Sequence, residues 1–512
     1  MFSKVQTCHL DGLTGSLVDV EAENLNGFSA FHIVGLAGTS IQESKERIRA
    51  ALSSLSLSMP LGRIVVNLLP GEQHKSGAYW DLPILVALLG CMGLVSPMRL
   101  NDTAFWGALS LNGEIRGVRG SLAMANALLQ AGIHRFVLPA ENVTECRLLE
   151  GVELIPVHDV QELFRFLRGA ESIKIVYGNG QQDGVKRKPS FTGDYADICG
   201  QATLKRILEI AAAGKHSLLL IGPPGVGKTM AIRRLPGILP PLTKQERQEA
   251  TQIASACGLL QGEQIVSDPP FRMPHYTVTK TGLIGGGRPL QPGEITLAHH
   301  GVLFLDELLE FPRSLLELLR TPMENGTVLL SKGGRFDEFP CAFQLIACAN
   351  PCPCGNAGNA LKHCSCTETE IRRYRSKLSH PFVDRIDLFW ELNGLREGEG
   401  KEAENRPETP DMLSRVMEAR ERQEHRMNKW GVFYNARIPD HVPADALALS
   451  AGAEKAIAYL RQHGNLFERG VRKTLLVART IADLDGAAQI GEKQVFEAFQ
   501  YRRTQEKYWP TQ

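Results

Sequence analysis

The segment from Gly222 to Thr229 constrains the fold of this chain more than any other stretch. It reads Gly-Pro-Pro-Gly-Val-Gly-Lys-Thr and fits the Walker A pattern G-x-x-x-x-G-K-[ST]. The apolar run 216–220 before it predicts a β-strand, and residues 230–235 after it predict a helix whose N-terminus faces bound phosphates. A glycine-rich turn that binds nothing would lack these flanks. The pattern therefore predicts an α/β core that binds a nucleotide.

Each residue type in this loop has a physical role in holding ATP. Glycines let the backbone bend so that successive N–H groups point at phosphate oxygens, Lys228 adds a positive charge, and Thr229 offers a hydroxyl to Mg²⁺. The expected nucleotide-binding residues are Gly222, Pro223, Pro224, Gly225, Val226, Gly227, Lys228 and Thr229.

A second motif, Gly301 to Glu307, is an apolar strand that ends in two carboxylates, the Walker B pattern. We expect Asp306 to hold Mg²⁺ through water and Glu307 to orient and polarise the attacking water. The alternative is an ordinary strand followed by a capped helix. A further apolar run, 342–349, predicts another core strand and ends in Asn350, whose amide can hold the same water.

Composition limits what the rest of the chain does. Its 512 residues exceed one typical domain and predict three globular units. A net charge of +1 excludes a globally basic nucleic-acid protein but leaves room for a local basic channel. No apolar run approaches the roughly 18 to 20 residues that span a bilayer, and the N-terminus lacks the long apolar region of a signal peptide. We therefore expect a cytoplasmic protein.

Polar, breaker-rich segments divide the chain. The expected parts are an α/β domain over 1–172, a linker over 173–192, an ATPase domain over 193–394, a second linker or exposed loop over 395–410, and a helical lid over 411–512. Apolar periodicity in the last part predicts helices over 413–426, 444–462, 469–484 and 493–503.

Two stretches of the first domain, 75–83 and 113–120, resemble the protease-domain fold of Lon, which is shared with part of ribosomal protein S5. The resemblance places Tyr79 where Lon has its nucleophilic serine and Leu122 where it has its general-base lysine. Ser76 lies nearby, but without a matched base it stays a poor nucleophile. The domain is therefore expected to be catalytically inactive.

Residues 327–339 predict two short strands around Gly333-Gly334, a hairpin between Walker B and Asn350. Lys332 and Arg335 at its tip are candidates for phosphate contacts with DNA, and the alternative is a solvated basic turn.

Four of the eleven cysteines cluster in sequence: Cys352, Cys354, Cys364 and Cys366. Four thiolates satisfy tetrahedral zinc, and His363 is a possible substitute ligand. The alternative is a reduced, metal-free loop, because the cytoplasm disfavours disulfides.

Stretches 271–277, 283–300, 373–388 and 478–486 resemble the magnesium-chelatase-like AAA+ proteins of the ComM/YifB family, and the match runs from end to end. The resemblance implies an AAA+ core with a C-terminal helical lid and assigns Asn350 to the sensor-1 position. It also implies that Arg385 enters the neighbouring subunit's nucleotide site, although by itself the triplet Arg385 to Asp387 could equally be a surface ion pair. It places Arg469 at the sensor-2 position, with Arg472 as the alternative, and either could instead be an ordinary exposed helix charge.

The function that this resemblance implies is an ATP- and Mg²⁺-dependent DNA motor. It would form a homo-oligomeric ring, expected to be a hexamer, with the 327–339 hairpins in its pore. Acting as a helicase, it would drive branch migration of recombination intermediates when incoming DNA is integrated, without reading sequence. The alternatives are a chelatase-like chaperone that remodels a protein or inserts a metal into a small molecule, and a peptidase with its own unfolding motor.

Overall fold

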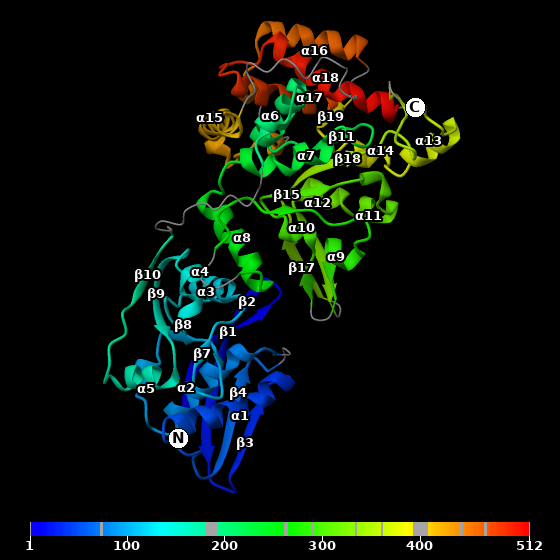
Figure 1. Cartoon of the computed structure of the whole chain (residues 1–512). Helices are drawn as coiled ribbons and strands as arrows, with labels where there is room; N and C mark the ends of the chain where they lie inside the picture. The colour runs from blue at the N-terminus through cyan, green and yellow to red at the C-terminus, as the bar shows by residue number, and fades with distance from the viewer. Residues whose placement is uncertain are drawn as a thin grey trace. The chain divides into compact units, whose positions relative to one another are not determined.

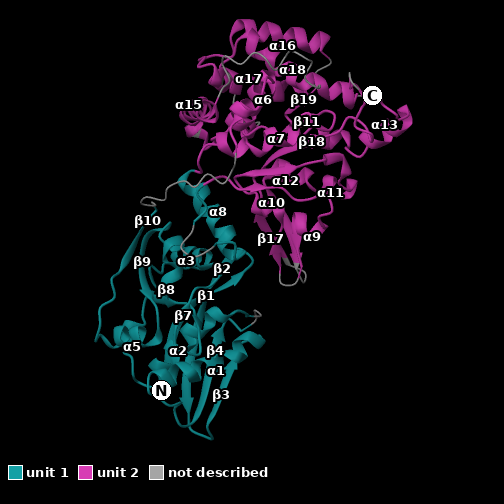
Figure 2. Ribbon diagram, viewed as in Figure 1, with its two compact units in different colours: residues 1–186, 243–267 teal, residues 187–242, 268–512 magenta. Residues whose placement is uncertain are grey.

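The structure, a computed structural model, describes residues 2–71, 75–180, 193–260, 265–287, 290–332, 335–359, 362–392, 408–439, 442, 444–464 and 468–510 (Figure 1). Figure 2 shows two compact units, which are described separately below. Unit 1 contains Met1–Lys186 and Thr243–Ser267, and unit 2 contains Arg187–Leu242 and Asp268–Gln512. Each unit has hydrophobic core clusters of its own.

Unit 1 is built on a mixed β-sheet, with eight strands in the described ranges. Their spatial order is β10 (Val176–Asn179), β9 (Glu150–Val157), β8 (Arg135–Pro139), β5 (Thr103–Phe105), β1 (Phe2–Asp11), β2 (Thr14–Leu25), β4 (Arg63–Leu69) and β3 (Ala30–Val34). β1 and β2 form an antiparallel hairpin, whereas β5, β8 and β9 run parallel. Along β4 the alternate residues Ile64, Val66 and Leu68 are buried, as expected for a strand with one face on a core.

Helix α2 (Asp81–Cys91) belongs to the core of unit 1, and all of its residues are buried. Its N-terminal Asp81 carboxylate accepts hydrogen bonds from Arg47 Nε on α1 (Thr39–Ser54) at 2.6 Å and from the Leu109 N–H at 3.1 Å. The Ser44 hydroxyl also donates to it. A buried carboxylate requires such donors. The bond to Asp81 raises the pKa of Arg47 and links α1 to α2.

Tyr79 and Leu122 occupy the positions that match the catalytic serine and lysine of Lon, and neither side chain can replace that pair. The Tyr79 hydroxyl accepts from the Leu10 N–H at 3.3 Å, and burial raises the pKa of Tyr79. Leu122 is fully buried on α3 (Ser121–Gln130). Ser76 is exposed, while the ammonium of the adjacent Lys75 donates to the carbonyls of Gly35 and Pro70. The inactivity of this domain stays a prediction.

A helix from the middle of the expected ATPase domain belongs to unit 1. It is α8 (Lys244–Ala256), which begins with a capping box formed by Thr243 and Glu246. The Ser255 hydroxyl on α8 accepts a hydrogen bond from the Gly120 N–H at 3.0 Å, at the start of α3. Gln252 Nε2 donates to the Leu13 carbonyl at 3.2 Å. Residues 243–267, which lie within the expected domain 193–394, therefore cluster with unit 1, because the buried partners of α8 lie on the N-terminal sheet unit. The expected domain boundaries stay a prediction.

Unit 2 contains a parallel sheet, in which the described strands follow the order β12 (Phe271–Arg272), β15 (Val302–Leu305), β18 (Gln344–Ala349), β11 (Leu218–Ile221) and β19 (Leu388–Glu391). Every residue of β11, β15 and β18 is buried, which explains their continuous apolar sequences. The expected strands are therefore present: β11 precedes the phosphate loop, β15 precedes the Walker B carboxylates, and β18 precedes Asn350. Their carboxyl ends meet at one edge of the sheet.

The C-terminal part of unit 2 is helical, as expected, with α15 (Thr409–Met427), α16 (Ala451–His463), α17 (Glu468–Leu484) and α18 (Glu492–Tyr508). Buried residues of these helices share one hydrophobic core with α6 (Ala202–Gly214) and the parallel sheet. The predicted α/β fold with a helical C-terminal part is confirmed. In the part of the chain that the structure describes, no helix has the length and apolarity needed to cross a membrane.

We predict that Ser255→Ala destabilises unit 1 by about 1 to 3 kcal/mol, because it leaves the buried Gly120 N–H without its acceptor. Chemical denaturation of the full chain measures this change. The matched control is Gln245→Ala on the exposed side of α8, with an expected change within about 0.5 kcal/mol. Equal stabilities of the two variants would contradict the assignment of α8 to the core of unit 1.

Candidate nucleotide site

The phosphate loop joins the buried strand β11 to helix α7 (Lys228–Arg233) and takes a shape that only glycine permits at three positions. Gly225 and Gly227 have φ values of 83° and 91°, in the left-handed region. A Cβ at Gly222 would lie 2.6 Å from the Leu392 carbonyl oxygen. The segment therefore turns closely over the end of β11, and its last two residues, Lys228 and Thr229, already form the start of α7.

Lys228 is buried within this loop. Its Nζ donates hydrogen bonds to the carbonyls of Gly222 at 2.5 Å and Pro223 at 2.8 Å, and to Asn350 Oδ1 at 3.3 Å. Burial lowers the pKa of Lys228, while the carboxylates of Asp306 and Glu307 act in the opposite direction. A buried ammonium whose acceptors are neutral carbonyls and an amide fits a site for anionic phosphate oxygens.

The Walker B carboxylates lie at the end of β15, beside this loop. Thr229 Oγ1 donates to Asp306 Oδ2 at 2.9 Å, so the hydroxyl and the carboxylate expected to hold Mg²⁺ are in contact. Hard oxygen donors of this kind suit Mg²⁺. The structure thus brings together four expected site residues from three elements: Lys228, Thr229, Asp306 and Asn350.

Glu307 has a backbone conformation that is rare for residues other than glycine. Its φ is 52°, in the left-handed region, and its side chain is exposed. Its N–H donates to Asp306 Oδ1 at 3.0 Å, which helps to stabilise this turn. Such strain persists where surrounding contacts enforce it and concentrates at functional sites. The conformation directs the backbone away from β15 immediately after Asp306.

Arg385 and Arg469 do not join Lys228 but pair with one carboxylate elsewhere in unit 2. Glu324, on α12 (Arg320–Asn325), lies 2.7 Å from Arg385 Nη2 and 2.6 Å from Arg469 Nη2. Although partial burial opposes the change, the two guanidinium groups lower the pKa of Glu324. Both arginines line a cleft between the sheet and the C-terminal helices. Among the described residues lining this cleft, none comes from the phosphate loop, Walker B or Asn350.

The segment that carries Arg385 is held by the C-terminal helices. Asp387 Oδ1 pairs with Lys473 Nζ on α17 at 2.7 Å, and Asp387 Oδ2 accepts from the Ser217 N–H at 2.9 Å. Burial would raise the pKa of Asp387, but Lys473 and His216 lower it well below its usual value. Arg502 on α18 donates to the Ile386 carbonyl at 3.1 Å. The position of the Arg385 segment therefore depends on how α17 and α18 pack within unit 2.

Sequence reasoning missed Glu324, because one glutamate on a short helix carries no local signal. It also left the sensor-2 arginine open between Arg469 and Arg472. In the structure Arg469 pairs with Glu324, while Arg472 donates to the backbone carbonyls of Ile438 and Pro439. Arg469 therefore shares its environment with Arg385.

The expected hairpin is present as β16 (Thr327–Lys332) and β17 (Arg335–Pro340), which pair antiparallel from Thr327↔Pro340 to Lys332↔Arg335. The turn 333–334 and the side chains of Lys332 and Arg335 lie outside the described residues. On one face of the hairpin, Leu329 is 65% exposed and Phe336 is 71% exposed. The prediction for this hairpin concerns its basic groups alone, although the period-2 alternation of the two strands also indicates this apolar face.

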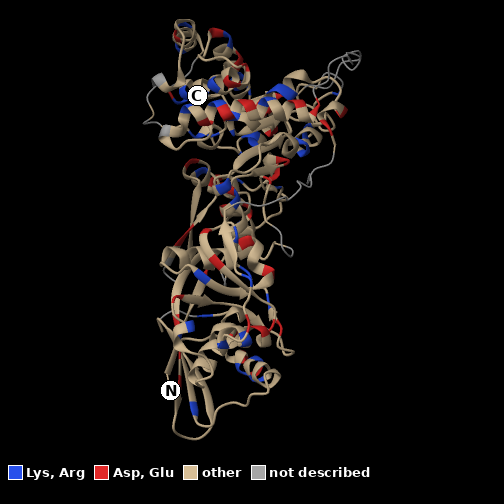
Figure 3. Cartoon of the chain, turned by 90° about the vertical axis from the view of Figure 1, so that its left-hand side faces the viewer, with Lys and Arg blue, Asp and Glu red and all other residues tan. Residues whose placement is uncertain are grey.

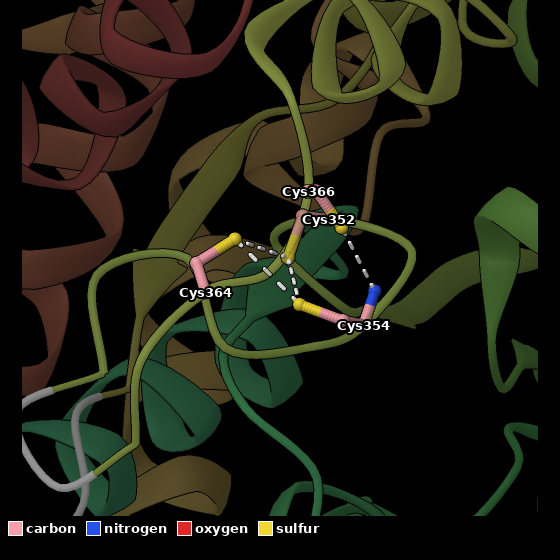
Figure 4. A group of neighbouring side chains, drawn as sticks. All are labelled: Cys352, Cys354, Cys364 and Cys366. Carbon is pink, nitrogen blue, oxygen red and sulfur yellow. Dashed lines mark hydrogen bonds between the residues drawn. The ribbon is translucent and has the colours of Figure 1, made fainter.

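The four clustered cysteines also come together. The Sγ atoms of Cys352, Cys354, Cys364 and Cys366 all lie within 4.8 Å of one another (Figure 4). His363, expected as a possible substitute, is exposed and does not belong to this group of ligand atoms.

A parallel sheet with this phosphate loop, these carboxylates at the end of a neighbouring strand and a helical C-terminal part defines an AAA+ ATPase. Comparison with known families agrees. Three family models match the chain. The model described as magnesium chelatase, subunit ChlI, matches residues 194–399, and the model described as subunit ChlI of Mg-chelatase matches residues 20–142. The model for the C-terminal part of magnesium chelatase subunit ChlI matches residues 407–502.

Full-length relatives identify the family within this class. The chain is 36% identical to competence protein ComM of Haemophilus influenzae over 498 residues, which cover 96% of this chain and 95% of that protein. It is 36% identical to YifB of Escherichia coli over 493 residues, with 96% and 95% covered. A Mycobacterium tuberculosis protein is 37% identical over 495 residues, with 96% and 97% covered. The chain belongs to the ComM/YifB family of magnesium-chelatase-like AAA+ proteins.

Two substitutions should separate nucleotide binding from hydrolysis. We predict that Lys228→Ala weakens ATP binding, because it removes the buried positive charge of the loop. We predict that Glu307→Gln still binds ATP but hydrolyses it at least about 100-fold more slowly, because it removes the carboxylate that polarises water. Fluorescent-nucleotide binding and phosphate release measure the two effects. Glu368→Gln, on an exposed helix, is the control, and full turnover by Glu307→Gln would contradict the Walker B assignment.

Proposed function

We propose that the chain is an ATP-driven motor whose complete nucleotide site forms between two copies of the chain. The observation that carries this proposal is the joint position of Arg385 and Arg469 on a cleft without phosphate-loop residues. A planar, permanently charged guanidinium suits the γ-phosphate. A second copy of the chain would supply that phosphate, and head-to-tail contacts that close give a ring. By family resemblance, the ring would contain six copies.

The residues of one copy would then share the work as follows. Lys228 and the loop N–H groups bind the phosphates of ATP, and Thr229 and Asp306 hold Mg²⁺. Bound Mg²⁺ neutralises charge on the phosphate oxygens. Glu307 accepts a hydrogen bond from the attacking water, and Asn350 holds that water in line.

DNA is the substrate that we propose for this motor. One relative, aligned over 95% of its length, is named a competence protein, and the hairpin of β16 and β17 presents Leu329 and Phe336 as an exposed apolar face. Exposed aromatic groups stack on bases without reading sequence. Figure 3 shows basic and acidic residues interspersed along the ribbon of the described chain, in agreement with the net charge of +1. High affinity for a polyanion therefore requires basic groups repeated around one channel, as a ring that repeats Lys332 and Arg335 would provide.

In this proposal the motor moves branched DNA junctions and helps an incoming strand to extend its pairing with the chromosome. The second candidate function is remodelling of a protein client or metal insertion into a small molecule. The matches to magnesium chelatase models favour that alternative.

We predict that forked DNA of arbitrary sequence stimulates ATP hydrolysis by the full chain. Because contacts to phosphates dominate, the stimulation should fall steeply between low and physiological salt. Measuring phosphate release with DNA, with a denatured protein and with a porphyrin separates the candidate functions. Stimulation by the protein or the porphyrin, with none by DNA, would replace the DNA-motor proposal with the remodelling alternative.

We also predict that Arg385→Ala and Lys228→Ala chains each hydrolyse ATP poorly alone but regain part of the activity when mixed. Where the two variants meet, the Arg385→Ala chain can supply an intact phosphate loop and the Lys228→Ala chain can supply an intact Arg385 to the same site. Phosphate release across a titration of the two variants measures this recovery. Absence of recovery, in mixed assemblies that form normally, would contradict the shared site.

A further inference from the structure

The four cysteine sulfurs already have nearly the spacing of a metal tetrahedron (Figure 4). Cys352 Sγ lies 3.4 Å from Cys354 Sγ and 3.7 Å from Cys364 Sγ, and Cys354 Sγ lies 3.6 Å from Cys364 Sγ. Thiolates about 2.3 Å from a zinc ion form a tetrahedron with S–S edges of about 3.8 Å. The measured separations are much longer than a disulfide bond of about 2.05 Å. The loop therefore presents four separate sulfur ligands around one point.

Backbone N–H groups of the loop point at these sulfurs. The Cys354 N–H donates to Cys366 Sγ at 3.4 Å, and the Ala357 N–H donates to Cys352 Sγ at 3.2 Å. Donors of this kind stabilise thiolates and orient metal ligands. Cys352 is fully buried, while the other three cysteines are partly exposed and leave a route for an ion.

The same loop presses against the phosphate loop within unit 2. A Cβ at Gly355 would lie 2.7 Å from Cδ of Pro224, so the backbone at Gly355 packs directly on that ring. Pro224 is a member of the Walker A segment. The position next to Cys354 thus supports the loop that is expected to hold the phosphates.

The cysteine loop also fixes Asn350, because only Pro351 separates Asn350 from Cys352. The Pro351 carbonyl accepts from Arg375 Nε at 3.1 Å, and the Arg375 guanidinium lies 4.3 Å from the centre of the Tyr508 ring. Asn350 is therefore held between the buried strand β18 on one side and the cysteine cluster on the other.

We propose that Cys352, Cys354, Cys364 and Cys366 bind one Zn²⁺ and that this zinc loop, residues 352–359 and 362–366, holds the phosphate loop and Asn350 in position. Zinc binding displaces the thiol protons and replaces them with four metal–sulfur bonds, without oxidation or reduction. The role of the site is positioning, because its four sulfurs fill the tetrahedral coordination of zinc and leave no open position for a substrate. The proposal that the four cysteines bind zinc does not depend on the proposed function. The proposal that the zinc loop positions the phosphate loop and Asn350 rests on the proposed nucleotide site.

Metal analysis of the full chain, purified under reducing conditions, tests the first half. We expect about one zinc per chain and loss of that zinc in Cys352→Ser and Cys364→Ser. After exchange, Co²⁺ should give the absorption of tetrahedral thiolate coordination. A chain without tightly bound zinc, a chain that holds iron instead, or a Cys352–Cys354 or Cys364–Cys366 disulfide would overturn the assignment.

A pair of glycine variants tests the second half. Gly355 and Gly358 have similar φ values of 79° and 77°, but a Cβ at Gly358 would meet nothing closer than Glu391 Oε1 at 3.6 Å. Both changes to alanine introduce similar backbone strain, and only Gly355→Ala collides with Pro224. We expect both variants to keep zinc, and we expect Gly355→Ala to bind ATP at least about tenfold more weakly than Gly358→Ala.

Removal of zinc from the wild-type chain by a chelator should weaken ATP binding in the same direction, with circular dichroism used to verify that the chain stays folded. Equal ATP affinities for the two glycine variants, or unchanged affinity after zinc removal, would overturn the positioning role. If wild-type protein contains zinc but binds no nucleotide, the proposed function fails while the metal site stands.

Discussion

The parallel pairing of β11 with β18 is the constraint on which the nucleotide site depends. Ile221 pairs with Ala349, so the residues that follow, Gly222 and Asn350, leave the sheet side by side. β15 pairs with the other edge of β18, and Leu305 opposite Ala347 brings Asp306 to the same edge. The contacts of Lys228 with Asn350 and of Thr229 with Asp306 follow from this register. A shift of either strand by one residue would turn its buried side chains to the opposite face of the sheet.

A second set of contacts extends from this sheet to the C-terminal helices. Glu324 joins Arg385 to Arg469, and Asp387 joins the Arg385 segment to Lys473. The helical part shares its core with the sheet, so the positions of the two arginines depend on how α17 packs. Under the proposed function, the helical part of one copy would move when that copy binds a nucleotide. The ion pairs of Glu324 and Asp387 would then shift Arg385 and Arg469 relative to the phosphates bound by the neighbouring copy.

Local motifs in the sequence predicted much of this site, because phosphate binding and water activation require fixed residue types at fixed spacing. Gly222 to Thr229, Asp306, the strand before Asn350 and the helical C-terminal part were all readable in this way. Glu324 was not, because its role arises from residues distant in sequence. The capping box of α8 marks a helix start but not the unit on which the helix packs. The packing of Gly355 on Pro224 also required three-dimensional contacts. The structure shows where the described site residues lie, while their roles in binding and hydrolysis, and those of Lys332 and Arg335, stay predictions.

The central claim is that a complete ATPase site requires two copies of the chain. The most direct test is the specific rate of ATP hydrolysis per chain, measured at saturating ATP over protein concentrations that span monomer to assembly, with mass measured in parallel. The account predicts that ATP binds to the monomer, where Lys228 and Thr229 are intact, and that hydrolysis per chain rises with assembly. Hydrolysis per chain that is the same for monomers and assemblies would contradict it.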